Sequence, residues 1–456
     1  MRPKTTSTER KALLYVLLSC AIFMVWGSIL AADPFAGLGD FKTVFYATRC
    51  LMQHGDPYNP AVLLRVHEAA GNRLPADPEK SRLFQIVMLK SVNLPTSLLL
   101  VAPLALLPWW LAGKIWLVLT AVFLSLAALL VWRVTKDRAP RASTLLICLL
   151  LCNSELILAT GNLAGIVAAL CVFGAWCFLE ERFEWAGIVC MGISLVLKPH
   201  DTVLVWFYFL LAGGIQRKRA LQTLGLAAAL AVPAILWVST IAPQWLPELH
   251  SNVLALGARG SINDPGPGSL GFHTSDYVIS LQAALSLFKD DPHFYNLASY
   301  LTCGVLLCAG AARVIQSRFT KRNGWIALAA IAAFSMLPVY HRSHDAKLLL
   351  LTVPACTMLW AGGGRLKWVA GLMTSGAIVC TSDVFSTIIV MIVDSVTGHL
   401  PGMWRNAAMI LLRPAPLILL ATGIFYLWVY FRRTALEQRE SAKANDSIGL
   451  ALATGS

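Results

Sequence analysis

Long apolar stretches recur along the whole chain, and they constrain its fold more than any other feature. Of its 456 residues, 57% are hydrophobic and 13% are charged, whereas about a quarter of the residues in a soluble domain are charged. A helix needs about 20 apolar residues to cross a bilayer. The pattern predicts an all-α, multi-pass membrane protein with twelve spans, near residues 12–31, 111–132, 142–159, 162–179, 185–197, 201–215, 220–242, 294–315, 325–340, 346–362, 367–393 and 409–431.

The first apolar run follows a basic segment, as the apolar region of a cleaved secretion signal would. Its apolar core is longer than the roughly 7 to 15 residues of such a signal, and "SILAAD" has Leu30 and Ile29 where a small residue is needed for cleavage. We therefore expect residues 12–31 to be a permanent membrane anchor.

Basic residues form short clusters between the apolar runs. The net charge of +13 would suit nucleic acid, but the clusters, such as "RVTKDRAPR" at 133–141 and "QRKR" at 216–219, do not form one continuous stripe. Lys and Arg are enriched in the cytoplasmic loops of membrane proteins. The clusters therefore predict cytoplasmic N- and C-termini in a cell membrane, either inner or plasma membrane, and no nucleic acid partner.

One further apolar stretch, 94–110, does not fit this orientation as a span. It is short, contains three prolines and ends in two tryptophans, which favours an interfacial or re-entrant segment. We place it in a long first outer loop, 32–110, and expect a second long outer loop at 243–293. These loops belong to a single membrane domain, 1–433, and the polar composition of the cytoplasmic tail, 434–456, predicts disorder.

The polar stretches that do not mark the cytoplasmic side gather on the outer side. The run 186–197 would rise only about 18 Å as a helix, which is too short to cross the hydrocarbon core. Lys198, His200 and Asp201 follow it and are expected below the outer interface, where charges are tolerated only against protein or a water-filled cavity. A snorkelling lysine and a helix-capping aspartate are the structural alternatives. With "HRSHDAK" at 341–347, they predict an outward-facing polar cavity.

The stretch after the first span, "GDFKTVFYATRCLMQHGDPY" at 39–58, has apolar residues at helical spacing. Tyr46 and Arg49 lie on the opposite, polar face. The pattern predicts an amphipathic helix on the outer surface. Asp40 stands at the start of this helix, where it suits either a helix cap or a functional carboxylate, and the local sequence leaves both roles open.

These stretches, in this order, resemble glycosyltransferase family 87, membrane enzymes of the GT-C fold that use sugars carried on polyprenyl phosphate. The resemblance covers about residues 10–360, and the order of the motifs makes it specific. It rests on the Asp-Phe pair at 40–41, the aromatic pair in "VFYA", the "HGDPY" turn, "LPTSLLLVAPLALLP", "GNLAGIVAAL", "AGIVCMGISLVLKP" and a weaker "PGSLGF".

Two positions depart from the family pattern. The usual paired tyrosines are Phe45 and Tyr46 here, and the usual Asn-Gln before Ser269 is Pro267-Gly268. The sugar and the acceptor can therefore differ from those of the mannosyl transfers best associated with the family.

The resemblance implies an inverting hexosyltransferase that moves a mannose-like hexose from a polyprenyl-phosphate donor to a glycan or glycolipid acceptor at the outer face. Asp40 is then implied as the general base that deprotonates the acceptor hydroxyl. Cations should face the departing phosphate, and the outer-side candidates are Lys198, Arg342, His341, His344 and Lys347. The candidates for positioning the sugar or the acceptor are Tyr46, Arg49, Asn162, His200 and Asp201.

We expect no cofactor and favour metal-independent catalysis. His341, His344 and Asp345 form a short cluster in a loop, but their spacing is not that of a helical metal motif, and cationic side chains can neutralise the phosphate instead. Ordinary polar loop residues are the alternative for both histidines. A polytopic transporter or lipid flippase is the alternative function, because buried charges also line translocation pathways. The lack of a repeat between the two halves of the chain argues against that alternative.

Overall fold

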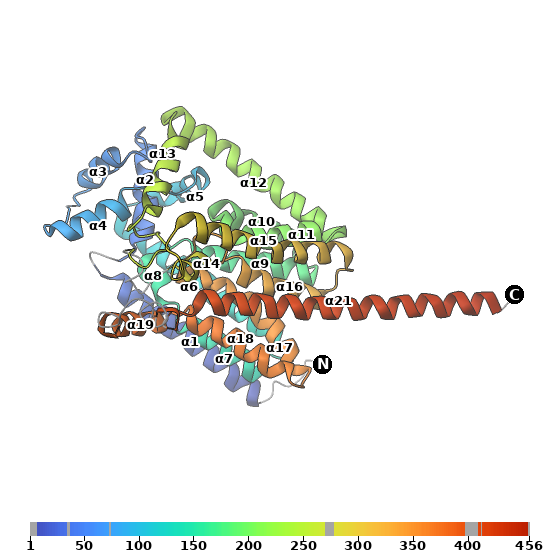
Figure 1. Ribbon diagram of the computed structural model, residues 1–456. Helices are drawn as coiled ribbons and strands as arrows, with labels where there is room; N and C mark the ends of the chain where they lie inside the picture. The colour runs from blue at the N-terminus through green and yellow to red at the C-terminus, as the bar shows by residue number, and fades with distance from the viewer. Residues whose placement is uncertain are drawn as a thin grey trace.

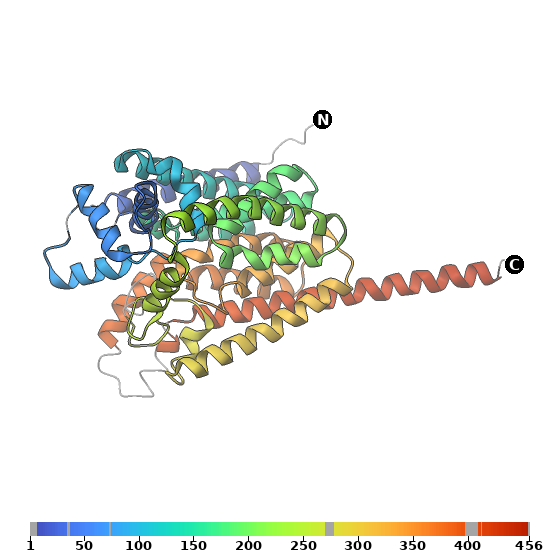
Figure 2. The same ribbon diagram turned by 90° about the horizontal axis from the view of Figure 1, so that it is seen from above.

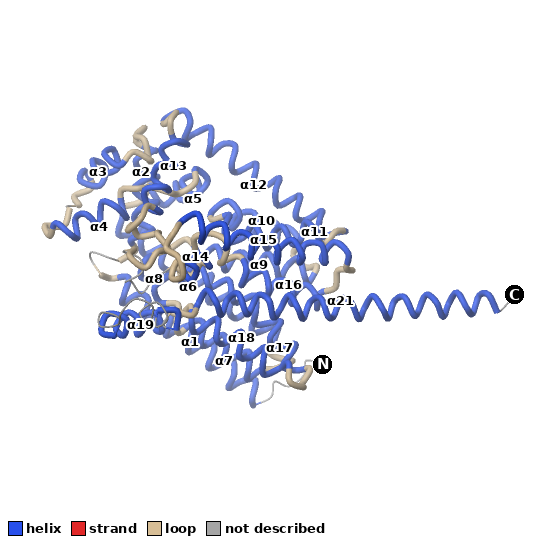
Figure 3. The backbone as a smooth tube through the Cα atoms, viewed as in Figure 1, coloured by secondary structure: helices blue, strands red, loops and turns tan. Residues whose placement is uncertain are grey.

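The computed structural model describes residues 7–33, 37–72, 74–269, 278–396, 409–411 and 413–454. These residues form helices joined by loops, and no strand occurs among them (Figure 3). This is the all-α class that the sequence predicts.

Helices are numbered along the chain. The N-terminal segment and the first outer loop contain α1 (Ser7–Ala31), α2 (Gly39–Met52), α3 (Pro60–Ala69), α4 (Pro78–Met88) and α5 (Pro95–Ala105). The central part contains α6 (Trp109–Thr135), α7 (Pro140–Leu151), α8 (Glu155–Thr160), α9 (Ala164–Glu180), α10 (Glu184–Leu197), α11 (Pro199–Leu211) and α12 (Gly214–Ile241). The C-terminal part contains α13 (Trp245–Gly257), α14 (Leu281–Leu285), α15 (Pro292–Gln316), α16 (Lys321–Phe334), the 3-10 helix η2 (Ser343–Leu351), α17 (Thr352–Ala361), α18 (Leu366–Cys380), α19 (Asp383–Val396) and α21 (Ala415–Thr454).

Some of the predicted spans are full-length helices and others are short. In the described chain, six segments are long and apolar enough to cross a membrane: Ser7–Ala31, Trp109–Thr135, Pro140–Thr160, Gly214–Ile241, Pro292–Gln316 and Ala415–Gln438. A seventh is added if Leu366–Cys380 and Asp383–Ile389, bent by 58°, form one span. Other predicted spans correspond to shorter helices, such as α9, α10 and α11 with 17, 14 and 13 residues. Twelve complete spans are therefore not confirmed.

The two ends of the chain lie at the same end of the helix bundle, and α2, α3, α4 and α13 lie at the opposite end (Figures 1 and 2). This arrangement agrees with a first outer loop on the side away from both termini. In the part of the predicted tail that the structure describes, residues 434–454 continue α21 as a helix to Thr454. The Ala, Glu, Gln, Lys and Arg residues of this segment are strong helix formers.

The first outer loop has an aromatic core of its own. Phe41 of α2 stacks on Trp116 of α6, with ring centroids 4.6 Å apart and planes inclined by 5°. Tyr46 stacks on Trp109 at 6.0 Å and is buried. The helix predicted to lie on the outer surface is therefore packed against α6, with its first turn fixed by stacked rings, which provide large buried areas and a defined geometry.

The two outer loops are joined by polar contacts between α13 and the residues around α3. The Nδ2 atom of Asn252 donates hydrogen bonds to the carbonyl oxygens of Tyr58, at 2.9 Å, and Ser91, at 3.1 Å. Nearby, desolvation and then the hydrogen bond and charge of Asp56 raise the pKa of the Glu248 carboxyl to about 7. The contact between the carboxyl groups of Asp56 and Glu248 is therefore most favourable when Glu248 is protonated.

This contact makes the docking of the outer loops dependent on pH. The pKa of Glu248 is higher in the folded state, so its contribution to stability is present below its ordinary pKa and is lost as the pH rises through about 7. We expect Glu248→Gln to raise the melting temperature at about pH 8 and to flatten its decline between about pH 5 and 8. Thermal unfolding of the detergent-purified protein checks this, with Glu68→Gln, an exposed carboxylate of α3, as the control. Equal pH dependence in both variants would contradict it.

Candidate active site

The candidate site begins at a break between two helices. Pro199 has no amide hydrogen to continue the ladder of α10, and Lys198 adopts φ −150° and ψ 80° between α10 and α11. The carbonyl groups that the break leaves without helical partners are bonded by α5. The hydroxyl of Thr96 donates to the Val196 carbonyl at 2.6 Å, and that of Ser97 donates to the Leu197 carbonyl at 3.0 Å. The segment 94–110, predicted to be non-spanning, therefore supplies the hydrogen-bond donors for the free carbonyl groups at this break.

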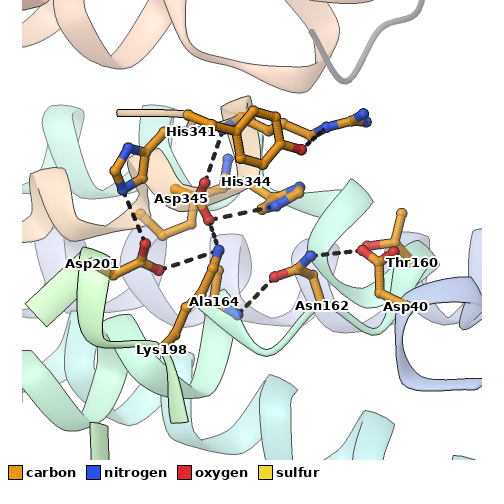
Figure 4. A network of polar contacts seen from close by, with 12 residues as sticks. Asp40, Thr160, Asn162, Ala164, Lys198, Asp201, His341, His344 and Asp345 are labelled. Carbon is orange, nitrogen blue, oxygen red and sulfur yellow. Dashed lines mark hydrogen bonds and ion pairs between the residues drawn. The ribbon is translucent and has the colours of Figure 1, made fainter. Parts of the chain in front are cut away.

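Lys198 is enclosed by two buried carboxylates. Its Nζ atom forms a short ion pair with Asp345 of η2 and lies 3.4 Å from Oδ2 of Asp201 in the first turn of α11. Asp201 and Asp345 are 4% and 2% exposed, respectively. Figure 4 shows the lysine between them. Buried charges persist in proteins when they are paired in this way, so the interaction holds η2 against the helix break.

These interactions set the charge states of Lys198 and Asp345. Burial alone would lower the pKa of Lys198, but Asp201 and Asp345 outweigh it and hold that pKa above its ordinary value. Burial would raise the pKa of Asp345, and Lys198 and then His344 reverse this and hold it well below the usual range. Lys198 and Asp345 are therefore an ammonium and a carboxylate, and the snorkelling alternative does not describe this lysine.

Three histidines surround this pair. The Nε2 atom of His341 lies 3.2 Å from Oδ1 of Asp201, and that of His200 lies 3.5 Å from the same oxygen. The Nε2 atom of His344 lies 3.4 Å from Oδ1 of Asp345. His341 and His344 are buried, whereas the side chain of His200 is 40% exposed. His200 is therefore the histidine through which a ligand from solvent can reach the cluster.

Arg342 and Lys347, both predicted to bind phosphate, have other contacts. The guanidinium of Arg342 donates to the Ile262 carbonyl at 3.0 Å and to Oδ1 of Asn263 at 3.1 Å. Its backbone amide donates to Asp345 at 2.8 Å. Arg342 thus fastens the second outer loop to the start of η2.

Lys347 lies deeper in the protein. It is 3% exposed, and its Nζ atom donates to the Asn153 carbonyl at 3.0 Å and lies 3.6 Å from Oδ1 of Asp383. Asp383 also accepts a hydrogen bond from the Leu156 amide at 2.8 Å, so it fixes the start of α8. Sequence reasoning missed Asp383. The signal was an acidic residue within an apolar run, which marks a paired or functional group in a membrane protein.

Asp40 reaches the site from α2. It is the second residue of that helix, and the preceding N-cap position is Leu38. The Nδ2 atom of Asn162 donates to Oδ2 of Asp40 at 2.7 Å, while Oδ1 of Asn162 accepts from the Ala164 amide at 2.8 Å. The backbone bond fixes which end of the amide faces Asp40. In Figure 4, Asn162 lies between Asp40 and the Lys198 cluster.

Gly161 permits this approach of α2 to Asn162. Its φ is +66°, and a Cβ atom here would lie 2.9 Å from Cβ of Phe41 and 3.1 Å from Cδ2 of Leu38. Its carbonyl accepts a hydrogen bond from the Trp116 indole at 2.8 Å. Glycine is the residue that tolerates both the left-handed backbone and the close contact.

Tyr46 and Arg49 point to a different part of the outer loop. The hydroxyl of Tyr46 accepts a hydrogen bond from Asn72 at 2.8 Å, and Arg49 lies over the Phe45 ring at 5.8 Å. The structure therefore brings Asp40 and Asn162 together, and separately Lys198, His200, Asp201, His341, His344 and Asp345. It gives Tyr46 and Arg49 no contact with either group among the described residues.

Helices of membrane-spanning length indicate a membrane protein, and the charges buried at a broken helix mark its candidate functional site. A comparison with protein families then assigns the chain to one family of membrane proteins. The model of glycosyltransferase family 87 matches residues 92–337, more than half of the chain, and the chain therefore belongs to this family. Neither curated proteins nor solved structures gave a match.

The family match identifies the protein as a glycosyltransferase and does not support the transporter alternative. The matched range contains Asn162, Lys198, His200 and Asp201. Asp40 and the segment 341–347 lie outside it, so their connection to the family region rests on the contacts described above.

The geometry at Gly161 gives a stability prediction. We expect Gly161→Ala to destabilise the protein by about 1 to 3 kcal/mol, because the new Cβ meets Phe41 and the backbone is left-handed. Thermal unfolding in detergent measures this. Gly225→Ala in α12 is the matched control, since its Cβ meets nothing within 4 Å and its φ is ordinary. A Gly161→Ala variant as stable as the control would contradict this account of α2 docking.

Proposed function

We propose that the protein is an inverting hexosyltransferase that moves a sugar, mannose-like in class, from a polyprenyl-phosphate donor to a glycan or glycolipid acceptor at the outer face of the membrane. The observation that carries the proposal is the Asp40–Asn162 hydrogen bond, which places a carboxylate of the first outer loop at the edge of a family-matched region with buried charges. The long apolar helices support a lipid-borne donor, which is delivered within the bilayer.

Asp40 is the general base in this proposal. The acceptor hydroxyl loses its proton to Asp40 as its oxygen attacks the anomeric carbon, and the bond from that carbon to the phosphate oxygen breaks on the opposite face. Asn162 donates to Oδ2 of Asp40, and no other described residue forms a hydrogen bond to this carboxylate. The other oxygen is therefore available for the acceptor hydroxyl, as a base within hydrogen-bond reach requires.

The Lys198 cluster is the proposed site of the leaving phosphate. Negative charge grows on the phosphate as the bond breaks, and fixed positive groups in a partly dry site stabilise it. Lys198 is 14% exposed and His200 is 40% exposed, so these two can face a ligand. Arg342 and Lys347, in their observed contacts, serve to hold the surrounding loops and helices. Their proposed role is therefore indirect.

The proposal predicts the effect of removing the base. We expect Asp40→Asn to lower the rate of sugar transfer by about 10² to 10⁴ with unchanged protein abundance, since general base catalysis contributes that much. The assay uses purified protein, a set of polyprenyl-phosphate sugars and a membrane glycolipid extract. Glu68→Gln, an exposed carboxylate on the same outer loop, is the control. Full activity in Asp40→Asn would reject Asp40 as the base.

Asn162 is proposed to position Asp40. Asn162→Ala should lower kcat by about 10-fold or more while changing the KM of either substrate little, because a misplaced base slows the chemical step more than it weakens binding. Steady-state kinetics with both substrates varied separates the two effects. A variant that raises KM alone would assign Asn162 to substrate binding.

A further inference from the structure

One contact in the Lys198 cluster leaves two buried polar atoms without hydrogen bonds. One ammonium, Lys198, faces two buried carboxylates, Asp201 and Asp345. Oδ1 of Asp201 and Nε2 of His341 face each other at 3.2 Å. Both residues are more than nine-tenths buried, and neither of these two atoms takes part in a hydrogen bond. A buried polar atom without a partner is costly, so this contact calls for a further positive group.

The second ring nitrogen of His341 indicates which atom faces Asp201 without a proton. Its Nδ1 atom lies 3.0 Å from the Val339 carbonyl oxygen. A carbonyl oxygen can only accept, so Nδ1 carries a proton. In the neutral ring, Nε2 then presents a lone pair to the carboxylate of Asp201. Two lone pairs that face each other at this distance repel, and a cation between them would bind both atoms.

His200 adds a third ligand atom. Its Nε2 atom lies 3.5 Å from Oδ1 of Asp201, and the ligand atoms of His200, Asp201 and His341 all lie within 4.8 Å of one another. Bonds of about 2.0 to 2.1 Å at tetrahedral angles place neighbouring ligand atoms about 3.3 Å apart. The observed 3.2 and 3.5 Å are close to this spacing. Two imidazoles and a carboxylate are a donor set that zinc and related divalent ions accept.

The surroundings also match those of a metal site. The Nδ1 atom of His341 donates to a backbone carbonyl, and the second oxygen of Asp201 lies 3.4 Å from Lys198. Outer contacts of this type fix the orientation of metal ligands. The side chain of His200 is 40% exposed, so an ion from solvent can reach this ligand. Figure 4 shows Asp201 with Lys198 on one side and His341 on the other.

We propose that His200, Asp201 and His341 bind one divalent cation of the zinc class, with a fourth position open to water or to an anionic oxygen. This differs from the metal-independent chemistry expected from the sequence. A divalent ion here would place two positive charges beside the carboxyl group of Asp201, which also lies 3.4 Å from Lys198. Resting on the proposed function, the open position then suits a phosphate oxygen of the donor.

Metal binding to the full-length protein in detergent tests the proposal. The protein is stripped with a chelator, titrated with Zn²⁺ or Co²⁺, and its bound metal is measured by mass spectrometry. We expect about one ion per chain, visible absorption bands from tetrahedral Co²⁺, and an affinity at least about 100-fold weaker in His200→Ala and His341→Ala. His293→Ala removes an exposed histidine elsewhere and should bind as the wild type does.

A stability measurement distinguishes the loss of a metal ligand from misfolding of a variant. Zn²⁺ should raise the melting temperature of the wild type and of His293→Ala, because a ligand that binds only the folded state stabilises it. It should not raise that of His200→Ala, whose partly exposed ring can be removed with little loss of packing. Absence of stoichiometric metal in the folded wild type, or unchanged affinity in His200→Ala, would overturn the proposal.

The metal assay uses no donor or acceptor, so its outcome is separate from that of the transfer assay. A protein that transfers sugar but binds no metal refutes only the cation site. A metal-loaded protein that transfers no sugar from any donor refutes only the proposed function.

Discussion

A lysine ammonium that lies within a membrane protein must be paired, and the architecture around Lys198 follows from this constraint. The helix break at Pro199 brings Lys198 to the site, and the hydroxyls of α5 bond the carbonyl groups that the break leaves free. Asp201 supplies one partner from the next helix. Asp345 supplies the other from η2, more than one hundred residues further along the chain. Segments distant in the sequence are thus held together by one charge.

Asp40 depends on a different kind of interaction. Stacked aromatic rings hold the first turn of α2 against α6, and Gly161 lets that turn come close enough for Asn162 to bond the carboxylate. Packing places the backbone, and a single amide then orients the reactive group. The proposed base and the proposed phosphate site are therefore built independently, the first by aromatic packing and the second by ion pairing.

Much of this could be predicted from the sequence. Apolar run length predicted the helical class, and the short run before Lys198 predicted a charged residue held against protein, as its ion pair with Asp345 shows. The prediction that 94–110 does not span stays a prediction. Run length could not show which runs form complete spans, because α9, α10 and α11 end at breaks that depend on neighbouring helices. Asp345, Asp383 and Gly161 acquire their roles only through contacts distant in sequence. Nor could composition show that Arg342 would bond Ile262 or that Lys347 would lie beside Asp383.

The contacts of Arg342 have a mechanical consequence. Its guanidinium is bonded to the backbone at Ile262, while its own amide is bonded to Asp345. One residue thus clamps the second outer loop to the carboxylate that neutralises Lys198. A movement of the second outer loop away from η2 would break the hydrogen bond between Arg342 and Ile262. The position of this loop is therefore linked, through Arg342, to the carboxylate that pairs with Lys198.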